Sequence, residues 1–411
     1  MKFDVLVLGG GIVGVSVATH LQMRGRSVAL VDLKQPGNET SFGNAGLIQR
    51  EGVYPYAFPR DIAALVKYAF NRSPEVRYHP RAMLKLTPFL WKYWFNSHPL
   101  RHAEIARSYA TLIQHSVREH HALADVAGGR HLIRPGGWLK VFRTAKKQDR
   151  ELEFAEKCLA EYGAKYEFLD AASLRQIEPD LQQTLLSALR YTESESVSDP
   201  GALVRAYAKY FSQLGGRFFI GDAFTLTEPW SVKTDEGNIR AKDVVITLGP
   251  WTDVLSSRLG YHFPLAVKRG YHMHYGATPQ VKLNHPVLDI EYGYLLVQMA
   301  QGVRLTTGAE FASRDSKKTP VQLMRVEPIA RKLFPITNRL EGSPWMGSRP
   351  CTPDMLPIIG PAPRHANLWF AFGHGHHGLT LGPVTGRMLA EMMTGEDLIT
   401  NPTPFRPDRF K

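Results

Sequence analysis

The sequence predicts an α/β protein that is built from two domains. Its first 32 residues have the pattern of a strand, a glycine-rich turn, a helix and a second strand. Residues 261–311 alternate between apolar and polar side chains in several short runs, which is typical of antiparallel strands. The length of 411 residues exceeds what one hydrophobic core usually supports. We therefore expect one domain on a parallel sheet and a second, α+β domain on a large, mainly antiparallel sheet.

The glycine-rich turn has the spacing G-x-G-x-x-G. It follows an apolar strand at 3–8, comprises Gly9, Gly11 and Gly14, and leads into a helix and then a strand that ends in Asp32. In a Rossmann-like fold the first glycine permits a tight turn, the second lets the backbone approach a pyrophosphate, and the third lets helix and strand pack closely. The helix N-terminus then faces the pyrophosphate. Asp32 can accept hydrogen bonds from the adenosine ribose. The motif alone leaves FAD and NAD open.

Composition and charge narrow the class of protein. With 44% hydrophobic and 21% charged residues the chain is expected to be globular. A net charge of +12 can attract nucleic acid, anionic lipid or small anions. Cys158 and Cys351 are too few for a disulfide framework or a zinc site, which favours a reducing, cytoplasmic location. We expect no secretion signal, because Asp4 and the glycines interrupt the first apolar run, and no membrane-spanning helix, because no apolar window reaches about 20 residues.

Residues 51–130 differ from the rest in texture, because aromatic residues, cations and prolines are interleaved there. We expect a helical insert. It could be a layer that packs its aromatic side chains inward, or a patch that rests on the cytoplasmic face of the inner membrane through aromatics and cations. Nucleic acid is not expected as a partner, since no recognised binding motif accompanies the charge.

The predicted elements imply that the chain crosses between the domains several times. A strand is expected at 136–142, helices at 147–162 and from 200 to about 214, and a buried strand at 244–251. The expected cofactor domain is discontinuous and comprises 1–50, 197–256 and 341–411. The expected substrate domain comprises 51–196 and 257–340.

Three histidines lie within four positions of the C-terminal stretch GHGHHGLTLGPVTGR: His374, His376 and His377. They precede a helical pattern that Gly395 is expected to end. A metal site would need carboxylates or cysteines nearby. None lies in this stretch, so we expect no metal. The histidines could instead contact a cofactor or substrate, or they could serve packing alone.

Three segments of the sequence resemble a known group of flavoproteins. The stretch TSFGNAGLI at 40–48 resembles the S-x-x-N-A-G segment of the D-amino-acid oxidase-like superfamily, and in particular the SFGNAG of bacterial D-amino-acid dehydrogenases. The histidine stretch at 373–387 resembles the superfamily's C-terminal loop, above all in D-proline and D-hydroxyproline dehydrogenase-like members. Residues 347–360 resemble its G-x-R-P-x-x-P-D-x-x-P-x-x-G segment. The resemblance is strong in the first 50 and last 65 residues and near 246, and weak in the middle.

The resemblance implies a bound FAD. The C-terminal loop would lie under the isoalloxazine, and the helix after it would aim its N-terminus at the pyrimidine end, where negative charge collects on reduction. The flavin-bearing cysteine of sarcosine oxidase-like relatives falls at Gly347, so we expect non-covalent FAD. The expected FAD contacts are Gly9, Gly11, Ile12, Val13, Gly14, Asp32, Leu33, Ser41, Asn44, Ala45, Gly46, Leu47, Ala223, Thr247, Leu248, Gly249, Trp251, Arg349, Gly375, His376, His377, Gly378, Leu379 and Thr380.

The resemblance also implies the residues that meet the substrate. In glycine oxidase-like and D-amino-acid oxidase-like members an arginine in the 347–360 segment grips the substrate carboxylate, and here it is Arg349. A guanidinium pairs with a carboxylate in two places and stays charged. The alternative for Arg349 is a structural salt bridge. A tyrosine on the large sheet would add a hydrogen bond, with Tyr294 the first candidate and Tyr271 the second. His377 is expected at the substrate or the flavin edge.

The implied reaction is the oxidative deamination of a D-amino acid, with D-proline or hydroxy-D-proline as candidates. Hydride passes to flavin N5, and the resulting imine is hydrolysed. This route needs orientation more than a general base. Electrons would pass to a quinone or respiratory carrier rather than to oxygen. The alternatives are an enzyme for another amine such as glycine or sarcosine, a flavoprotein subunit of a larger dehydrogenase, and an NAD-dependent enzyme.

Overall fold

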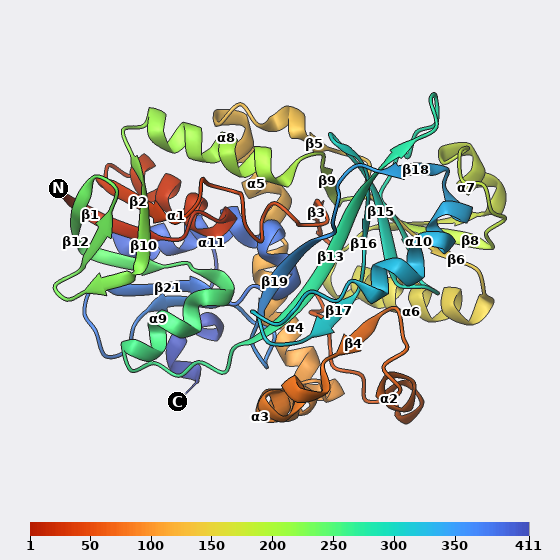
Figure 1. Cartoon of the computed structure of the whole chain (residues 1–411), viewed down its shortest axis with the longest axis horizontal. Coiled ribbons are helices and arrows are strands. Elements are labelled where there is room, and N and C mark those ends of the chain that lie inside the picture. Colours follow the sequence, from red (N-terminus) through yellow and green to blue (C-terminus); the bar gives the residue numbers. More distant parts are fainter. Residues whose placement is uncertain (411) are drawn as a thin grey trace.

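The computed structural model describes residues 1–410. Residue 411, the last of the predicted cofactor domain, lies outside the described residues. Figure 1 shows two lobes side by side, with both chain ends in the lobe that carries the parallel sheet. Within the described residues the strands form three sheets. The predicted fold class, a Rossmann-like α/β domain beside a large, mainly antiparallel sheet, is confirmed.

The first sheet is parallel in its centre. β1 pairs with β2 on one side and with β12 on the other, so the two predicted apolar strands at the N-terminus lie side by side. The continuation through β10 and β21 is also parallel. β11 pairs antiparallel with both β10 and β12, and β20 pairs antiparallel with β21 at one end of the sheet. The strands of this sheet are β1 (Lys2–Leu8), β2 (Val28–Asp32), β10 (Arg217–Thr227), β11 (Ser231–Thr234), β12 (Gly237–Ile246), β20 (Ile358–Pro361) and β21 (Leu368–Phe372).

The large sheet is mainly antiparallel, with parallel pairs at β14–β6 and β17–β4. Its centre is the long strand β13, which pairs with β16 along one part of its length and with β19 along another. The strands of this sheet are β4 (Val76–Tyr78), β6 (Trp138–Phe142), β7 (Tyr166–Asp170), β8 (Ser187–Tyr191), β13 (Ala266–Ala277), β14 (Val287–Asp289), β15 (Tyr294–Met299), β16 (Gly302–Thr306), β17 (Ala309–Phe311), β18 (Ile336–Arg339) and β19 (Trp345–Cys351). A small third sheet comprises β3 (Leu47–Ile48), β5 (Ile133–Arg134) and β9 (Glu195–Val197).

Helices cover both lobes. In the first lobe α1 (Ile12–Met23) packs between α8 (Pro200–Gln213) and α11 (Gly378–Thr394), and α4 (Pro99–Ile113) and α5 (Ser116–Val126) pack on α11. The approach of α1 and α11 is close, because a Cβ at Gly386 would lie 2.6 Å from the Ser16 carbonyl carbon. The remaining helices are α2 (Ile62–Ala69), α3 (Pro80–Asn96), α6 (Ala145–Tyr162), α7 (Ala171–Ile177), α9 (Thr252–Arg258) and α10 (Val321–Leu333).

The predicted domain boundaries remain a prediction, and the pairing of one strand, β19, does not follow them. β19 lies inside the segment 341–411 that was expected in the cofactor domain, yet it pairs with β13 in the large sheet from Ala266 to His272. The reason is that β19 crosses between the lobes before β20 and β21 return the chain to the first sheet. Among residues 1–410 no helix is long and apolar enough to cross a membrane.

The segment 51–130 forms α2 to α5 and the short strand β4. The sequence left open whether its aromatic side chains pack inward or face outward, and the structure contains both arrangements. On α3 the side chains of Phe89 and Tyr93 are buried against Ala266 and Cys351, whereas Trp91 is 66% exposed. Part of the insert therefore packs inward, and part of it presents aromatic surface to the outside.

Candidate active site

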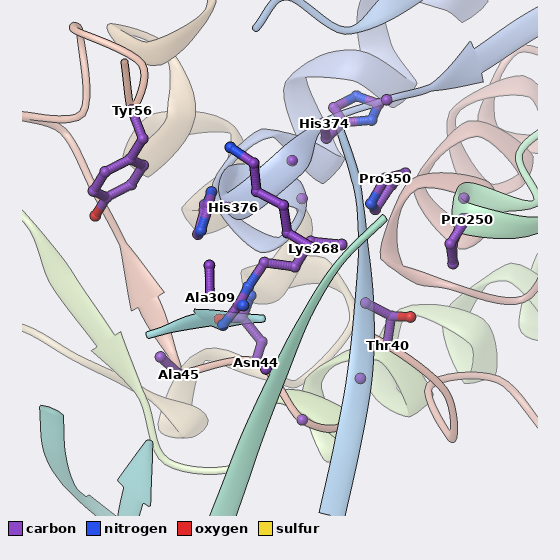
Figure 2. A pocket seen from close by; sticks show the side chains of 18 of the residues that line it. Thr40, Asn44, Ala45, Tyr56, Pro250, Lys268, Ala309, Pro350, His374 and His376 are labelled. Carbon is purple, nitrogen blue, oxygen red and sulfur yellow. The ribbon is translucent and has the colours of Figure 1, made fainter. Parts of the chain in front are cut away.

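A cavity of about 990 Å³ runs between the two lobes and takes its walls from both sheets. This volume lies at the upper end of the usual range for ligand pockets, about 300–1,000 Å³, and so suits a large ligand. Asp32 lines its first part, Arg349 and His376 line its second part, and Leu65 and Tyr68 of α2 contribute to the wall beyond. Figure 2 shows the part of the cavity around Lys268, His376 and Tyr56.

The glycine turn has the geometry that a pyrophosphate site requires. Gly9 adopts φ +119°, which favours glycine, and Gly14 has no room for a side chain, since a Cβ there would lie 1.9 Å from the Gly9 carbonyl oxygen. Gly11 is different. It lines the cavity, and the nearest protein atom to a Cβ at this position would be Ser41 Oγ at 3.5 Å. The space in front of Gly11 is thus left to a ligand, at the N-terminus of α1.

The carboxylate of Asp32 is held at the end of β2 by two backbone N–H groups. Gly10 donates to its Oδ2 at 2.6 Å and Lys34 donates to its Oδ1 at 2.9 Å. Burial raises the pKa of Asp32 above its ordinary value, while the N–H group of Gly10 opposes that shift. The carboxylate lines the cavity and remains available to the hydroxyl groups of a ribose.

The segment around 40–47 is fixed to both lobes. Ser41 Oγ accepts a hydrogen bond from Ile12 N at 3.0 Å, which ties the segment to the start of α1. On the other side the buried Arg304 of β16 donates to the carbonyl oxygens of Phe42 and Asn44. The segment therefore forms a fixed wall of the cavity between the glycine turn and the large sheet.

The three histidines of the C-terminal loop separate into different environments. His376 lines the cavity, with its ring centroid 4.6 Å from that of Tyr56. His374 bonds through Nε2 to Thr385 Oγ1 at 2.9 Å, and His377 bonds through Nδ1 to Tyr109 Oη at 2.8 Å. Burial lowers the pKa of His374 to about 3 and that of His377 to about 4. Burial and the neighbouring cations lower the pKa of His376 as well, so all three rings are neutral at pH 7.

Arg349 brings a buried cation into the cavity. Its guanidinium lies against Gly270 of β13, where a Cβ would come within 2.4 Å of Nη1. Its Nη1 donates a hydrogen bond to the Arg269 carbonyl oxygen at 3.4 Å, and no salt bridge to Arg349 occurs within residues 1–410. Burial lowers the pKa of Arg349. The structural salt bridge considered as the alternative role is therefore absent from the described part of the chain, and the guanidinium is free to bind an anion.

Sequence reasoning missed two polar residues of this cavity, Tyr56 and Lys268. Tyr56 lines the cavity with 53% of its surface accessible and packs on His376. The ammonium of Lys268 donates to Tyr93 Oη at 2.8 Å and lies 4.0 Å from the centroid of that ring. Tyr56 belongs to the loop before α2, so no strand pattern pointed to it. Lys268 lies three residues before Tyr271 in the stretch KRGY at 268–271. The alternation of side chains along β13 could have placed it on the same face of the sheet as Arg349.

The structure does not support Tyr294 as a carboxylate ligand. Its side chain is not part of the cavity wall, because its hydroxyl donates to Asp289 Oδ2 at 3.1 Å inside the core of the large sheet. The neighbours Gly293 and Leu295 line the cavity instead, as the alternation of a strand requires. Tyr271 does line the cavity. Its hydroxyl, however, donates to Glu310 Oε2 at 2.8 Å.

Most of the expected FAD contacts lie in the cavity wall, and four do not. The exceptions have other roles: Gly14 packs helix on strand, His377 bonds to Tyr109, and Thr380 Oγ1 bonds to the Leu47 carbonyl oxygen at 3.2 Å. Gly46, the fourth, adopts φ +74°. The expected contacts in the wall are Gly9, Gly11, Ile12, Val13, Asp32, Leu33, Ser41, Asn44, Ala45, Leu47, Ala223, Thr247, Leu248, Gly249, Trp251, Arg349, Gly375, His376, Gly378 and Leu379.

One group of metal-ligand types occurs in the described chain, away from the histidine loop. It comprises His272, His274 and Glu341. Both ring nitrogens of His274 have partners there, since Arg304 Nε donates to Nε2 at 2.9 Å and Glu341 bonds to Nδ1. The adjacent guanidinium of Arg304 opposes the binding of a second cation at His274. The ring nitrogens of His272, by contrast, have no hydrogen-bond partner in the described part of the chain.

The fold and the cavity together define a dinucleotide-binding enzyme whose cofactor site continues into a cationic, partly apolar substrate site. The glycine turn, the ribose-binding carboxylate and the N-termini of α1 and α11 fit FAD, with Gly378 and Leu379 at the start of α11 lining the cavity.

Comparison with known proteins gives the family. The FAD dependent oxidoreductase family (DAO) matches residues 4–392, and the chain belongs to this family. It is 30% identical to a D-amino acid dehydrogenase of Granulibacter bethesdensis over 95% of this chain and 96% of that protein. It is 28% identical to a D-amino-acid oxidase of Bradyrhizobium diazoefficiens, over 99% and 98%. The protein is therefore an oxidoreductase that uses FAD.

Solved structures support the fold. Glycine oxidase from Geobacillus kaustophilus aligns over 98% of both chains with a TM-score of 0.73 and 22% identity. L-Proline dehydrogenase from P. horikoshii aligns over 100% of this chain and 98% of that one, with a TM-score of 0.72 and 19% identity.

Proposed function

We propose that the protein is a D-amino-acid dehydrogenase that binds the substrate carboxylate through Arg349. The observation that carries the proposal is a buried guanidinium without an acidic partner within residues 1–410, facing a cavity that begins at the dinucleotide site. A planar guanidinium of this kind binds a carboxylate with two parallel hydrogen bonds. The names of the curated relatives, D-amino acid dehydrogenase and D-amino-acid oxidase, support the same class of substrate.

The residues of the cavity can orient the substrate. Arg349 fixes the carboxylate, and the hydroxyl of Tyr56 takes the second hydrogen bond that the sequence assigned to Tyr294 or Tyr271. Neutral His376 forms a wall together with the ring of Tyr56. Bound FAD supplies the hydride acceptor in this family of reactions. What the chain contributes is orientation of the α C–H bond and exclusion of water, and neither requires a general base.

The first test is reduction of the purified yellow protein without oxygen. D-Alanine, D-proline and cis-4-hydroxy-D-proline are each added, with their L-enantiomers as controls and with glycine and sarcosine as alternative amines. Bleaching of the flavin absorbance by D-enantiomers supports the proposal. Bleaching by glycine or sarcosine alone would contradict it and assign the protein to another amine. Slow reoxidation in air, together with fast reoxidation by a quinone analogue, distinguishes a dehydrogenase from an oxidase.

The proposed FAD is held without a covalent bond. Gly347, the position that corresponds to the flavin-bearing cysteine of other members, carries no nucleophile. Acid precipitation should release the flavin into the supernatant, and yellow colour that remains in the pellet would contradict this part of the proposal.

We further propose that the surface formed by α2 and α3 rests on an anionic membrane, where a quinone can accept the electrons. Figure 1 shows both helices projecting from the lower edge of the molecule. Ile62, Phe70, Leu84 and Trp91 are between 66% and 82% exposed there. Exposed lysines and arginines accompany them: Lys67, Arg72, Arg81, Lys85 and Lys92. Since α2 also lines the cavity through Leu65 and Tyr68, this surface borders the substrate side of the site.

Co-sedimentation with vesicles tests the membrane contact. The protein should sediment with vesicles that contain anionic phosphatidylglycerol and remain in solution with neutral ones. Leu84→Ser combined with Trp91→Ser should weaken binding, whereas the matched pair Leu340→Ser and Met324→Ser, which are exposed outside α2 and α3, should not. Equal behaviour of the two double variants would contradict the proposed surface.

A further inference from the structure

Two cations share one face of the strand pair β13–β19. Lys268 of β13 lies directly opposite Arg349 of β19 in the antiparallel register. Directly opposite residues project to the same side of a sheet. Both side chains accordingly line the cavity, and Lys268 is only 6% exposed.

The heads of these two side chains point in opposite directions along the strands. The guanidinium of Arg349 lies over Gly270, two residues beyond Lys268 along β13. The ammonium of Lys268 lies on the ring of Tyr93, which packs against Ala266 and Cys351, the register pair on the other side. The two positive charges are therefore set apart along the cavity wall, and they do not converge on one point.

Neither cation is neutralised by the protein. No salt bridge joins Lys268 or Arg349 to an acidic side chain in the described chain, and the ammonium of Lys268 donates a hydrogen bond to the hydroxyl of Tyr93. The acidic residues of the cavity wall have partners elsewhere: Glu75 pairs with Lys67, Glu39 pairs with Lys34, and Asp32 and Asp222 accept backbone N–H groups. An unpaired buried charge costs several kcal/mol, so two such cations in one cavity call for two anionic groups on the ligand.

We propose that the substrate is a D-amino acid with a second carboxylate in its side chain, held between Arg349 and Lys268. Arg349 binds the α-carboxylate and Lys268 binds the side-chain carboxylate, with the ring of Tyr93 beneath the ammonium. This inference rests on the proposed function of the same site and narrows its substrate class. It favours D-aspartate- and D-glutamate-like substrates over the cyclic imino acids, which carry a single carboxylate.

Matched pairs of substrates isolate the charge of the side chain. D-Glutamate and D-glutamine have nearly the same shape and differ by one negative charge, as do D-aspartate and D-asparagine. The wild-type kcat/KM with an artificial electron acceptor should be at least about tenfold higher for the acid of at least one pair. Lys268→Met should abolish that ratio by lowering the value for the acid and leaving the amide within about threefold. Lys92→Met, which removes an exposed lysine of α3, should leave the ratio unchanged.

A binding measurement without turnover separates this inference from the proposed function. Glutarate and butyrate are titrated into the oxidised protein, and the perturbation of the flavin absorbance gives their dissociation constants. Glutarate should bind at least about tenfold more tightly than butyrate, and Lys268→Met should remove the difference. If no D-amino acid reduces the flavin, the proposed function fails, whereas the two titrations still decide whether Lys268 forms a second anion site.

Three results would overturn the inference. A wild-type preference for both amides over their acids would exclude an anionic side chain. An equal loss for acid and amide in Lys268→Met would mean that Lys268 shares the α-carboxylate with Arg349. Equal affinity for glutarate and butyrate would mean that the second cation binds no ligand carboxylate. If Lys268→Met is isolated without FAD, the wild-type ratios and the Lys268→Arg variant, which keeps the charge, decide the question.

Discussion

The two ends of the cavity are built in different ways. At the nucleotide end the walls are backbone: Gly9 and Gly11 leave space, the N-terminus of α1 supplies N–H groups, and Asp32 is fixed by N–H groups of its own turn. The other end, where the substrate's carboxylic acid group is proposed to bind, is called the acid end. Its walls are side chains from segments that lie far apart in the sequence. Arg349 and Tyr56 meet there although they are nearly 300 positions apart in the sequence.

This difference teaches where each function resides. The nucleotide end binds its ligand through its shape and through backbone dipoles, which do not change with pH. It therefore depends on glycines, whose lack of a side chain leaves space for the ligand. The acid end binds through unpaired charge in a buried setting, so it depends on a few side chains that must be present. Substitutions should therefore affect cofactor content at one end and substrate turnover at the other.

Replacement of Arg349 should produce the largest effect. Arg349→Gln removes one partner of a buried ion pair with the substrate, which is worth about 3–5 kcal/mol, or roughly two to four orders of magnitude in kcat/KM. The FAD content should remain that of the wild type, since the nucleotide end is untouched. Kinetics on the best D-amino acid and the ratio of flavin to protein absorbance measure both quantities.

Arg349→Lys is the matched control for this change. It keeps the charge but loses the two-pronged geometry, so it should recover only part of the lost activity. A fully active Arg349→Gln variant would show that the carboxylate is bound elsewhere and would remove the contrast between the two ends.

Two alanine substitutions in the glycine turn sharpen the contrast from the other side. Gly14→Ala places a Cβ 1.9 Å from the Gly9 carbonyl oxygen and should destabilise the fold by about 3 kcal/mol or more. Gly11→Ala meets no protein atom closer than 3.5 Å, so the apoprotein should keep its stability and lose affinity for FAD. Thermal unfolding of the apoproteins and FAD titration separate the two outcomes. Equal melting temperatures would contradict the assigned packing role of Gly14.

Replacement of Tyr56 should have a smaller effect, confined to the acid end. Tyr56→Phe removes a hydrogen bond to a charged group, worth about 1.5 kcal/mol, and should raise KM roughly tenfold with little change in kcat. Tyr54→Phe is the matched control, because the hydroxyl of Tyr54 bonds to Glu161 at the surface and Tyr54 does not line the cavity. An unchanged KM in Tyr56→Phe would leave the second hydrogen bond to the carboxylate unassigned.

The same contrast explains how much the sequence could predict. The strand, turn and helix around Gly9 to Asp32 are local, so spacing alone predicted their fold and their role. Arg349 followed from a resemblance within one short segment. The choice of Tyr294 depended on which face of β15 meets the cavity, which the sequence does not show, and in the structure its hydroxyl bonds to Asp289 in the core. Tyr56 lies in an irregular loop that reaches the site through tertiary packing, and no periodicity marks it.

The histidine loop joins the two ends, and its protonation should link stability to pH. Burial lowers the pKa of His377 to about 4 from an ordinary value of 6.5. Below pH 6.5 the unfolded chain binds a proton that the folded chain does not bind until about pH 4, so stability falls as the pH falls through that range.

His377→Gln removes this group and can still bond to Tyr109. The free energy of unfolding in urea at pH 7, 6 and 5 should then fall less steeply than in the wild type, by up to about 1.4 kcal/mol per pH unit. Replacement of the exposed His131 by Gln should leave the wild-type slope, and an unchanged slope in His377→Gln would mean that this ring takes up its proton in the folded state as readily as in the unfolded one.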